Sequence, residues 1–176
     1  MLPVQRALIW SRSGSESCAQ RLTRELGLDV RPASDLSEAT SQSDVIVTCT
    51  PAKSWILGRQ HVSPGTFVAA VGADSPDKQE IDPALLANSS VVCDLVEQCA
   101  HVGDLHHAII AGLMKREQIR GELGAVIAGT APKRTHDDEI IVFDSTGTAL
   151  QDCAASAAVY ERAKVLGRGT PFAFWG

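Results

Sequence analysis

The sequence lacks several features that would each indicate a class of protein. No apolar run is long enough to cross a bilayer and no signal-peptide core follows the first methionine, so we expect a cytoplasmic protein without a membrane partner. No basic run occurs and the net charge is −5, which argues against a nucleic-acid partner. The five cysteines contain no CxxC pair, and small buried thiols explain them without a disulfide or a metal.

A glycine-rich phosphate-binding turn is also missing. Dinucleotide sites are commonly built on GxGxxG after the first strand, and no such motif follows a strand here. The first predicted strand, residues 7–10, instead ends in Ser11, Arg12 and Ser13, which suits the second strand of a Rossmann unit. An arginine there accommodates the 2′-phosphate of NADP. We therefore expect that the chain begins after its phosphate-binding turn and that residues 11–13 bind the cofactor; the alternative is a solvated arginine at a strand end.

What is present is a chain of 176 residues that is 44% hydrophobic and 21% charged, enough for one domain with a real core. Apolar strands alternate with short helices in its first half. The predicted strands are residues 7–10, 28–30, 44–49, 66–71 and 90–93, and the predicted helices are residues 16–26, 36–40 and 83–86. Strands that are apolar on both faces and alternate with helices predict an α/β fold with a Rossmann-type parallel sheet. Without the glycine turn, this sheet is incomplete.

The regular alternation of strands and helices ends after residue 94. Helices are predicted for residues 104–114 and 122–129, and one more strand for residues 140–143. The last predicted helix, residues 149–166, is unusually rich in alanine. Small side chains permit close approach of backbones, so we expect this helix to pack tightly on the sheet or across an oligomer interface.

One carboxylate and one amine follow the strand at residues 66–71. Gly72 and Ala73 lead to Asp74, and Lys78 comes four residues later. Ligands of open parallel sheets gather beyond the carboxyl ends of the strands, so Asp74 lies where a cofactor enzyme keeps its acid or base. The alternative is that these residues only form a turn.

Four motifs together resemble the ornithine cyclodeaminase/mu-crystallin family. They are residues 48–51 (TCTP), 71–80 (VGADSPDKQE), 103–105 (GDL) and 143–152 (FDSTGTALQD). The resemblance implies an NAD(P)-dependent enzyme, since the family includes ornithine cyclodeaminases, ketimine and pyrroline-2-carboxylate reductases and some alanine dehydrogenases. It also implies a partial NAD(P)-binding Rossmann domain over residues 1–140, followed by a closing loop and a helix of the substrate and dimerisation domain over residues 141–176.

The resemblance also implies roles for individual residues. Asp74 resembles the catalytic acid or base, and Lys78 a residue that lines the cofactor pocket. The remaining cofactor contacts carried over are Thr48, Cys49 and Thr50 beside the riboses, Val71, Gly72 and Ala73 at the nicotinamide, and Ser145 in the closing loop. Thr146 resembles a substrate contact. The family's N-terminal half, which supplies the basic residues that bind the substrate carboxylate, has no counterpart here.

The chemistry fits these residues. Reduction of a cyclic imine needs a hydride at carbon, which nicotinamide supplies, and a proton at nitrogen, which a carboxyl group supplies if burial raises its pKa. We predict reduction of a ketimine such as pyrroline-2-carboxylate with NADPH, by a homodimer whose partner is a small amino or cyclic imino acid. The alternatives are an ornithine cyclodeaminase with bound NAD, an alanine dehydrogenase, or, from another class, a non-catalytic nucleotide-binding remnant.

Two other sites are weaker hypotheses. His101, Asp104, His106 and His107 suggest a metal site, but adjacent histidines on a helix point in different directions, and Asp104 suits a helix cap better. Ser145 suggests a hydrolase, but no GxSxG elbow surrounds it. We expect neither.

Overall fold

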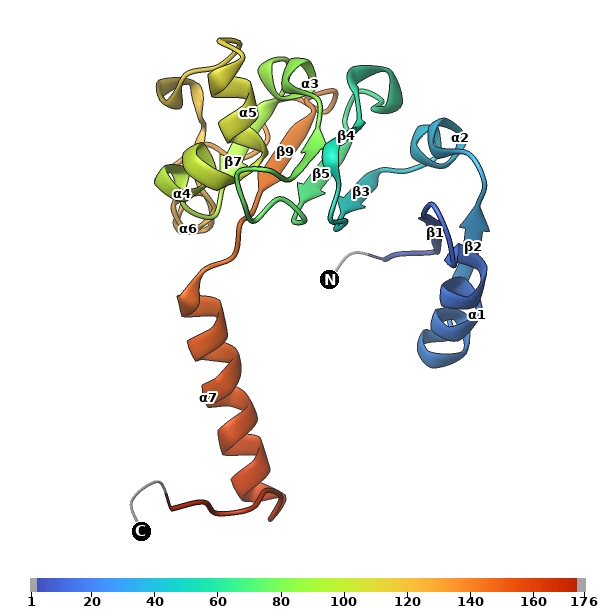
Figure 1. Cartoon of the computed structure of the whole chain (residues 1–176), viewed down its shortest axis with the longest axis vertical. Coiled ribbons are helices and arrows are strands. Elements are labelled where there is room, and N and C mark those ends of the chain that lie inside the picture. The colour runs from blue at the N-terminus through green and yellow to red at the C-terminus, as the bar shows by residue number, and fades with distance from the viewer. Residues whose placement is uncertain (1–2, 174–176) are drawn as a thin grey trace. The chain divides into compact units, whose positions relative to one another are not determined.

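The computed structural model describes residues 3–173 (Figure 1). The chain divides into two compact units, one ending at Thr146 and one beginning at Gly147. The division falls beyond the boundary predicted after residue 140, because the strand Ile141–Asp144 pairs with strands of the first unit. Each unit is therefore described by itself.

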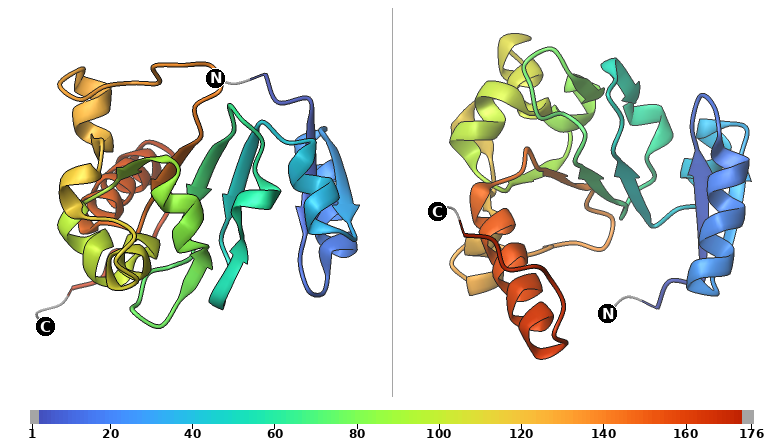
Figure 2. Two further views of the ribbon diagram at one scale, coloured as in Figure 1. Left: turned by 90° about the horizontal axis from the view of Figure 1, so that it is seen from above. Right: turned by 60° about the horizontal axis from the view of Figure 1, so that its bottom comes forward.

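The first unit begins with a small parallel sheet of two strands. Its elements are β1 (Arg6–Trp10), α1 (Ser15–Leu26) and β2 (Asp29–Ala33). The helix α1 ends at Gly27, whose positive φ of 63° suits glycine and whose N–H donates to the carbonyl oxygen of Thr23. Figures 1 and 2 show this pair of strands with α1 beside it, apart from the strands of the larger sheet.

The larger sheet has five parallel strands and confirms the predicted fold class. In spatial order they are β3 (Val45–Thr48), β5 (Phe67–Ala70), β9 (Ile141–Asp144), β7 (Ser90–Cys93) and β8 (Gly121–Glu122). Each neighbouring pair is parallel, as the βαβ pattern of the sequence predicted. The strand β9, last in sequence, lies between β5 and β7, and its insertion completes this order.

Short helices connect these strands. They are α2 (Leu36–Ser41), α3 (Pro83–Ala87), α4 (Val96–Val102), α5 (Asp104–Ile110) and α6 (Leu123–Ala128), with 3₁₀ turns η1 (Arg59–His61) and η2 (Arg116–Gln118). The helix α5 ends before the predicted residue 114 because Gly112 takes a positive φ of 69°. The core is formed by buried side chains such as Val68, Val142, Leu85 and Leu105.

One helix, the short strand β8 and one pair of strands were not predicted from the sequence. The helix is α4, and the strands β4 (Lys53–Leu57) and β6 (Gln79–Ile81) form a separate parallel pair. Neither strand is an apolar run, since β4 begins with lysine and serine and β6 contains a glutamate. Pairing between them, rather than local pattern, makes them strands.

The second unit contains α7 (Ala149–Val165). It begins with a capping box, in which the Thr148 N–H donates to the Gln151 side chain. None of the 17 residues of this helix, all of them described, is buried. Within residues 3–173, no helix combines the length and the apolar character needed to cross a membrane.

Candidate functional site

The loops after neighbouring strands leave the sheet side by side. The Val71 N–H donates to the carbonyl oxygen of Thr48 at 2.9 Å, which joins the end of β5 to the end of β3. The Ser145 N–H donates to the carbonyl oxygen of Ala70, also at 2.9 Å, and joins the end of β9 to β5. The carboxyl edge of the sheet therefore brings together most of the residues predicted from the sequence. They are Thr48, Cys49, Thr50, Val71, Gly72, Ala73, Asp74, Ser145 and Thr146.

A fully buried glutamate fixes two of these loops to each other. One carboxylate oxygen of Glu80 accepts the Thr50 N–H at 2.5 Å, and the other accepts the Gly72 N–H at 2.9 Å. A Cβ atom at Gly72 would collide with that carboxylate, so only glycine fits there. Glu80 thus sets the spacing between the loops after β3 and β5. This role was not predicted from the sequence, although an acid between Gln79 and Ile81 was a visible signal.

Two further buried carboxylates extend this hydrogen-bonded network. Asp104 Oδ1 accepts the N–H groups of Glu80 at 2.8 Å and Ile81 at 2.9 Å. Asp144 in turn accepts the N–H groups of Leu105 at 2.8 Å and of Asp104 at 3.3 Å. The prediction that Asp104 caps its own helix was therefore wrong. Asp144, at the end of β9, is the acid that caps α5. Asp104 instead accepts two N–H groups of β6. A buried carboxylate needs hydrogen-bond donors, and N–H groups without another partner supply them.

Burial raises the pKa of both aspartates. Loss of solvation raises the pKa of Asp104 to about 6 and that of Asp144 to about 8. Between about pH 4 and 6, folding therefore takes up a proton at Asp104. Its contribution to the unfolding free energy is full below about pH 4 and declines as the pH rises to 6.

Asp104→Asn is expected to reduce this pH dependence. The amide oxygen keeps the bonds to Glu80 and Ile81, but the side chain no longer titrates. Urea unfolding measures the decline in the unfolding free energy between pH 4 and 7. This decline should be smaller in the variant by about 2–3 kcal/mol, which corresponds to the pKa shift of Asp104 from 3.8 to about 6. Equal declines in the two proteins would contradict the assignment.

The hydroxyl groups after β9 are held by a neighbouring loop. Ser145 Oγ donates to Asp94 Oδ2 at 3.0 Å, and Asp94 follows β7. Thr146 Oγ1 accepts from Gln98 Nε2 at 2.8 Å. Ser145 is buried and Thr146 half-buried, so the loop predicted to close over the substrate begins from a fixed base.

Asp74 lies on an exposed loop and pairs with Lys78. Lys78 Nζ lies 2.6 Å from Asp74 Oδ1, and 56% of the Asp74 side chain is exposed. The hydrogen bond from Lys78 lowers the pKa of Asp74. The pKa raised by burial, which the sequence analysis required of a proton donor, is not found in this open arrangement. The carboxylate is therefore ionised at neutral pH.

Ser11, Arg12 and Ser13 lie at the end of β1, in the other sheet. All three are exposed, and Ser11 Oγ donates to the Ser13 carbonyl oxygen at 2.6 Å. Within residues 3–173, no hydrogen bond or ion pair engages Arg12. Its guanidinium is thus available to an anion, and the structure leaves it separate from the residues around Asp74.

The thiols differ from the expectation, and two of the histidines contact backbone carbonyl groups. Cys93 and Cys99 are buried, but Cys18 is half-buried and Cys49 and Cys153 are exposed, so the buried-thiol explanation was wrong for three of the five. His107 Nε2 lies 2.8 Å from the carbonyl oxygen of Lys78, and His106 Nδ1 lies 3.2 Å from that of Ala100. Backbone carbonyls thus account for these two rings.

Cys93, Cys99 and Asp144 form the one group in the described chain with metal-ligand spacing. Their ligand atoms lie within 4.8 Å of one another. Hydrogen bonds already engage them, since Cys99 Sγ donates to Asp94 and to the Asp144 carbonyl oxygen and the Asp144 carboxylate accepts two N–H groups. The contact with Cys93 and burial raise the pKa of the Cys99 thiol, which keeps its proton. The group holds α4 and β9 together.

Residues 1–166 match the model of the ornithine cyclodeaminase/mu-crystallin family. The chain belongs to this family. The resemblance seen in the four sequence motifs is therefore confirmed over most of the chain, and so is the Rossmann-type fold.

Individual members of the family resemble this chain in sequence and in structure. The iminosuccinate reductase of Paracoccus denitrificans is 46% identical over 143 residues, which are 81% of this chain and 44% of that protein. Its structure with NAD⁺ gives a TM-score of 0.85 at 40% identity, covering 93% of this chain and 50% of that one. The structure of the Δ¹-pyrroline-2-carboxylate reductase of Thermococcus litoralis with NADH and L-proline gives a TM-score of 0.91 at 26% identity. The match covers 96% of this chain and 53% of that one.

A third solved structure is an archaeal alanine dehydrogenase dimer with bound NAD. It gives a TM-score of 0.88 at 32% identity, over 99% of this chain and 54% of that one. The chain thus spans about half the length of the family members it matches. These members include imine reductases and a dehydrogenase.

Proposed function

We propose that this chain carries the acid–base carboxylate and the nicotinamide-side contacts of an NAD(P)-dependent enzyme that reduces the C=N bond of an α-imino acid. The observation that carries the proposal is the Asp74–Lys78 pair. It lies on the loop after β5, next to the Thr50 loop to which Glu80 joins it. Similarity to iminosuccinate and pyrroline-2-carboxylate reductases supports this class of reaction.

The residues at this edge fit one half of a dinucleotide. Thr50 and Thr146 offer hydroxyl groups of the kind that bind ribose and carboxamide. The sequence contains no glycine-rich turn after a strand to bind the pyrophosphate. The fit therefore concerns the nicotinamide side alone.

Asp74 is proposed to handle the proton. A bound nicotinamide supplies the hydride. Asp74, ionised beside Lys78, attracts a protonated imine nitrogen and orients it. Exclusion of water around Asp74 would raise its pKa and permit proton exchange with that nitrogen. Lys78 keeps a second exchangeable proton within 2.6 Å of the carboxylate.

The substrate is proposed to be an open-chain imino acid. The sequence motifs alone led to a cyclic ketimine with NADPH. The identity of 46% with an iminosuccinate reductase, against 31% with a pyrroline-2-carboxylate reductase of Bacillus thuringiensis, favours the open-chain compound. Ornithine cyclodeamination and alanine dehydrogenation are the alternatives within the family.

Oxidation of NADH or NADPH tests the proposal. The purified protein is assayed with iminosuccinate, pyrroline-2-carboxylate and pyruvate plus ammonia, and for ammonia release from ornithine with NAD. A second arm uses a chimera in which this chain replaces the matching half of the Paracoccus iminosuccinate reductase. We expect the fastest turnover with iminosuccinate. A folded chimera that binds NADH yet turns over none of these substrates would contradict the proposal.

Arg12 is proposed to set the cofactor preference. Arg12→Asp replaces an unpaired exposed cation by a carboxylate that repels a 2′-phosphate. A charge-assisted hydrogen bond contributes about 1.5–3 kcal/mol, so we expect affinity for NADPH relative to NADH to fall at least about tenfold. Fluorescence titration of both cofactors against the chimera measures this, with Arg24→Asp, in the exposed helix α1, as the control. An unchanged ratio would show that Arg12 does not contact the phosphate.

We also propose a homodimer formed through α7. This helix exposes Leu150, Val159 and Val165, and such apolar surface is typical of an interface. The related archaeal alanine dehydrogenase is a dimer. Light scattering after size exclusion tests the mass, and Val159→Asp is expected to give a monomer.

A further inference from the structure

Two side chains of α5 contact the segment that carries Lys78. Asp104, the first residue of α5, accepts the N–H groups of Glu80 and Ile81. His107, one helical turn later, lies with its Nε2 atom 2.8 Å from the carbonyl oxygen of Lys78. Residues three apart in a helix are neighbours on its surface, so one face of α5 holds this segment at two points.

These two contacts cover the edge of β6 that no strand of residues 3–173 pairs with. The other edge pairs with β4, where the Gln79 N–H donates to the carbonyl oxygen of Ala52 at 2.9 Å. Alternate residues of a strand direct their backbone groups to opposite sides, so Lys78 and Glu80 face α5. An acid and an imidazole of α5 thus supply that edge with the acceptor and the donor that a neighbouring strand would offer.

The His107 ring is the hydrogen-bond donor at this contact. A carbonyl oxygen only accepts, so the Nε2 atom carries the hydrogen, as it does in both the Nε2–H tautomer and the imidazolium. The His106 ring lies edge-on to it, with the ring centroids 5.3 Å apart. His106 Nδ1 contacts the carbonyl oxygen of Ala100 in α4 at 3.2 Å. Of these two adjacent histidines, His107 therefore holds the loop and His106 holds α4.

The carbonyl group that His107 holds belongs to the last residue of the Asp74 loop. The Lys78 N–H donates to the carbonyl oxygen of Ser75 at 3.0 Å, which closes a turn within the loop. The Lys78 side chain returns to Asp74, with Nζ 2.6 Å from Oδ1. Both backbone groups of Lys78 are thus bonded, one within the loop and one to α5, and together they set the direction from which its side chain starts.

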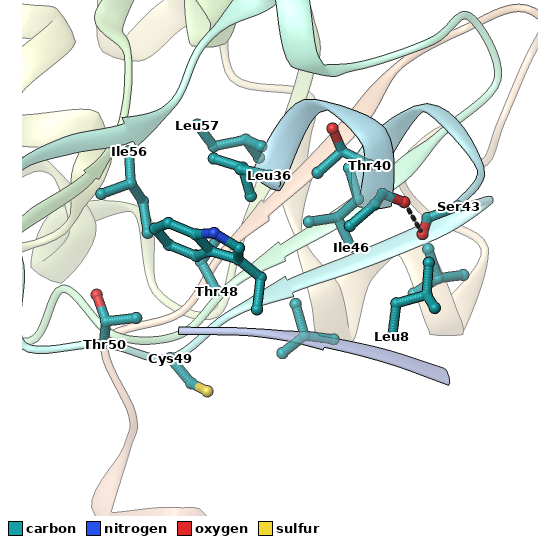
Figure 3. Close-up of a pocket in the computed structure, with 14 residues that line it drawn as sticks. Leu8, Leu36, Thr40, Ser43, Ile46, Thr48, Cys49, Thr50, Ile56 and Leu57 are labelled. Carbon is teal, nitrogen blue, oxygen red and sulfur yellow. Dashed lines mark hydrogen bonds between the residues drawn. The ribbon is translucent and has the colours of Figure 1, made fainter. Parts of the chain in front are cut away.

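The beginning of the same loop is held from a neighbouring strand. Glu80 joins the Gly72 N–H to the N–H of Thr50. Thr50 lies beyond the end of β3 (Figure 3). Glu80 therefore fixes the beginning of the Asp74 loop, and His107 fixes its end.

The ion pair depends on this support because it is exposed. The side chains of Asp74 and Lys78 are 56% and 28% exposed. Exposed pairs contribute little by themselves, since holding a flexible lysine in one geometry costs conformational entropy. When the main chain of the lysine is fixed, fewer arrangements compete with the paired one.

We propose that His107 is a positioning residue for the Asp74–Lys78 pair. Through the carbonyl oxygen of Lys78, it sets where the ammonium group stands, and the ammonium group in turn orients the Asp74 carboxylate. The effect of His107 on turnover rests on the proposed function, whereas its effect on Asp74 does not.

Carboxyl ¹³C NMR of this chain tests the effect on Asp74. The Asp74 signal is identified by its loss in Asp74→Asn and is followed between pH 3 and 6. His107→Phe keeps an aromatic ring but removes the donor. We expect the pKa of Asp74 to rise toward its ordinary value in this variant, because the hydrogen bond from Lys78 lowers it in the native protein.

Two further variants separate the hydrogen bond from the charge of the ring. His107→Gln also removes the imidazole but offers an amide N–H in place of Nε2–H, so the pKa of Asp74 should stay low. His106→Phe removes the adjacent imidazole, which contacts α4, and should also leave that pKa low. The proposal is overturned if the pKa of Asp74 is the same in His107→Phe as in His106→Phe, or if His107→Gln raises it as far as His107→Phe does.

A measurement on the unaltered chain needs no variant to fold. The imidazole ¹⁵N signals should show a hydrogen on Nε2 of His107 at neutral pH, because the Lys78 carbonyl oxygen accepts it. A ring with its hydrogen on Nδ1 alone would overturn the proposal.

Turnover by the chimera gives the readout on the reaction. His107→Phe should lower the single-turnover rate about tenfold or more, because a small misplacement of a reacting group costs up to about 100-fold. NADH affinity should not change, and His107→Gln should restore most of the rate. An active chimera whose rate His107→Phe leaves unaltered would overturn the proposal. A chimera that is inactive without any substitution would contradict the proposed function alone, and the pKa of Asp74 would still decide the role of His107.

Discussion

Asp74→Asn is expected to lower turnover of the imino acid by a factor on the order of 100 or more, while cofactor affinity stays nearly unchanged. The amide keeps the shape of the side chain but can neither carry the negative charge that attracts a protonated imine nor exchange a proton at neutral pH. The effect should appear in the single-turnover rate of the active chimera, with NADH affinity measured separately by fluorescence.

A second carboxylate of the same loop provides the control. Asp77 is exposed and pairs with Lys53 at 2.6 Å, as Asp74 pairs with Lys78. Asp77→Asn removes the same charge from the loop but lies away from the end of β5, and the rate should stay within about twofold. A rate for Asp74→Asn as high as that of Asp77→Asn would remove Asp74 from the mechanism.

Glu80→Ala is expected to have the largest effect on stability. It leaves the N–H groups of the half-buried residues Thr50 and Gly72 without their acceptor and opens a cavity beneath both loops. With about 1.5–3 kcal/mol for each hydrogen bond to a charged group, the unfolding free energy should fall by about 3 kcal/mol or more. Urea unfolding at pH 7 measures it.

Two further variants distinguish the loss of these hydrogen bonds from general destabilisation. Glu80→Gln keeps one oxygen acceptor and should lose about half as much. Glu97→Ala removes an exposed acid whose ion pair with Arg116 lies at the surface, so its change should stay within about 0.5 kcal/mol. If Glu80→Ala were no more destabilising than Glu97→Ala, Glu80 would not join the two loops.

If Glu80 positions the two loops, Glu80→Ala and Asp74→Asn should affect cofactor affinity and rate differently. Cofactor affinity should fall in Glu80→Ala, because the Thr50 and Gly72 loops lose their common support, whereas Asp74→Asn changes the rate and not the affinity. The two residues lie six positions apart, so this contrast distinguishes positioning from chemistry within one motif.

The sequence by itself determined the parallel sheet and the place of Asp74. The strands β3, β5, β7 and β9 were predicted because they are apolar on both faces, and this pattern is local. The position of Asp74 followed from the strand before it, since parallel strands bring their carboxyl ends to one edge. Family motifs supplied the remaining candidate residues, and their roles stay predictions.

Only the tertiary structure decided how that edge is held. Glu80, Asp104 and Asp144 bond to N–H groups distant in sequence, as Glu80 does to Thr50, 30 residues away, and Asp144 to Leu105, 39 residues away. No local pattern reports such pairs. The pKa of Asp74 likewise depends on exposure and on Lys78, which turned an expected rise into a decrease. The contact of His107 with the Lys78 carbonyl oxygen also appeared only in three dimensions, because the two residues lie 29 positions apart.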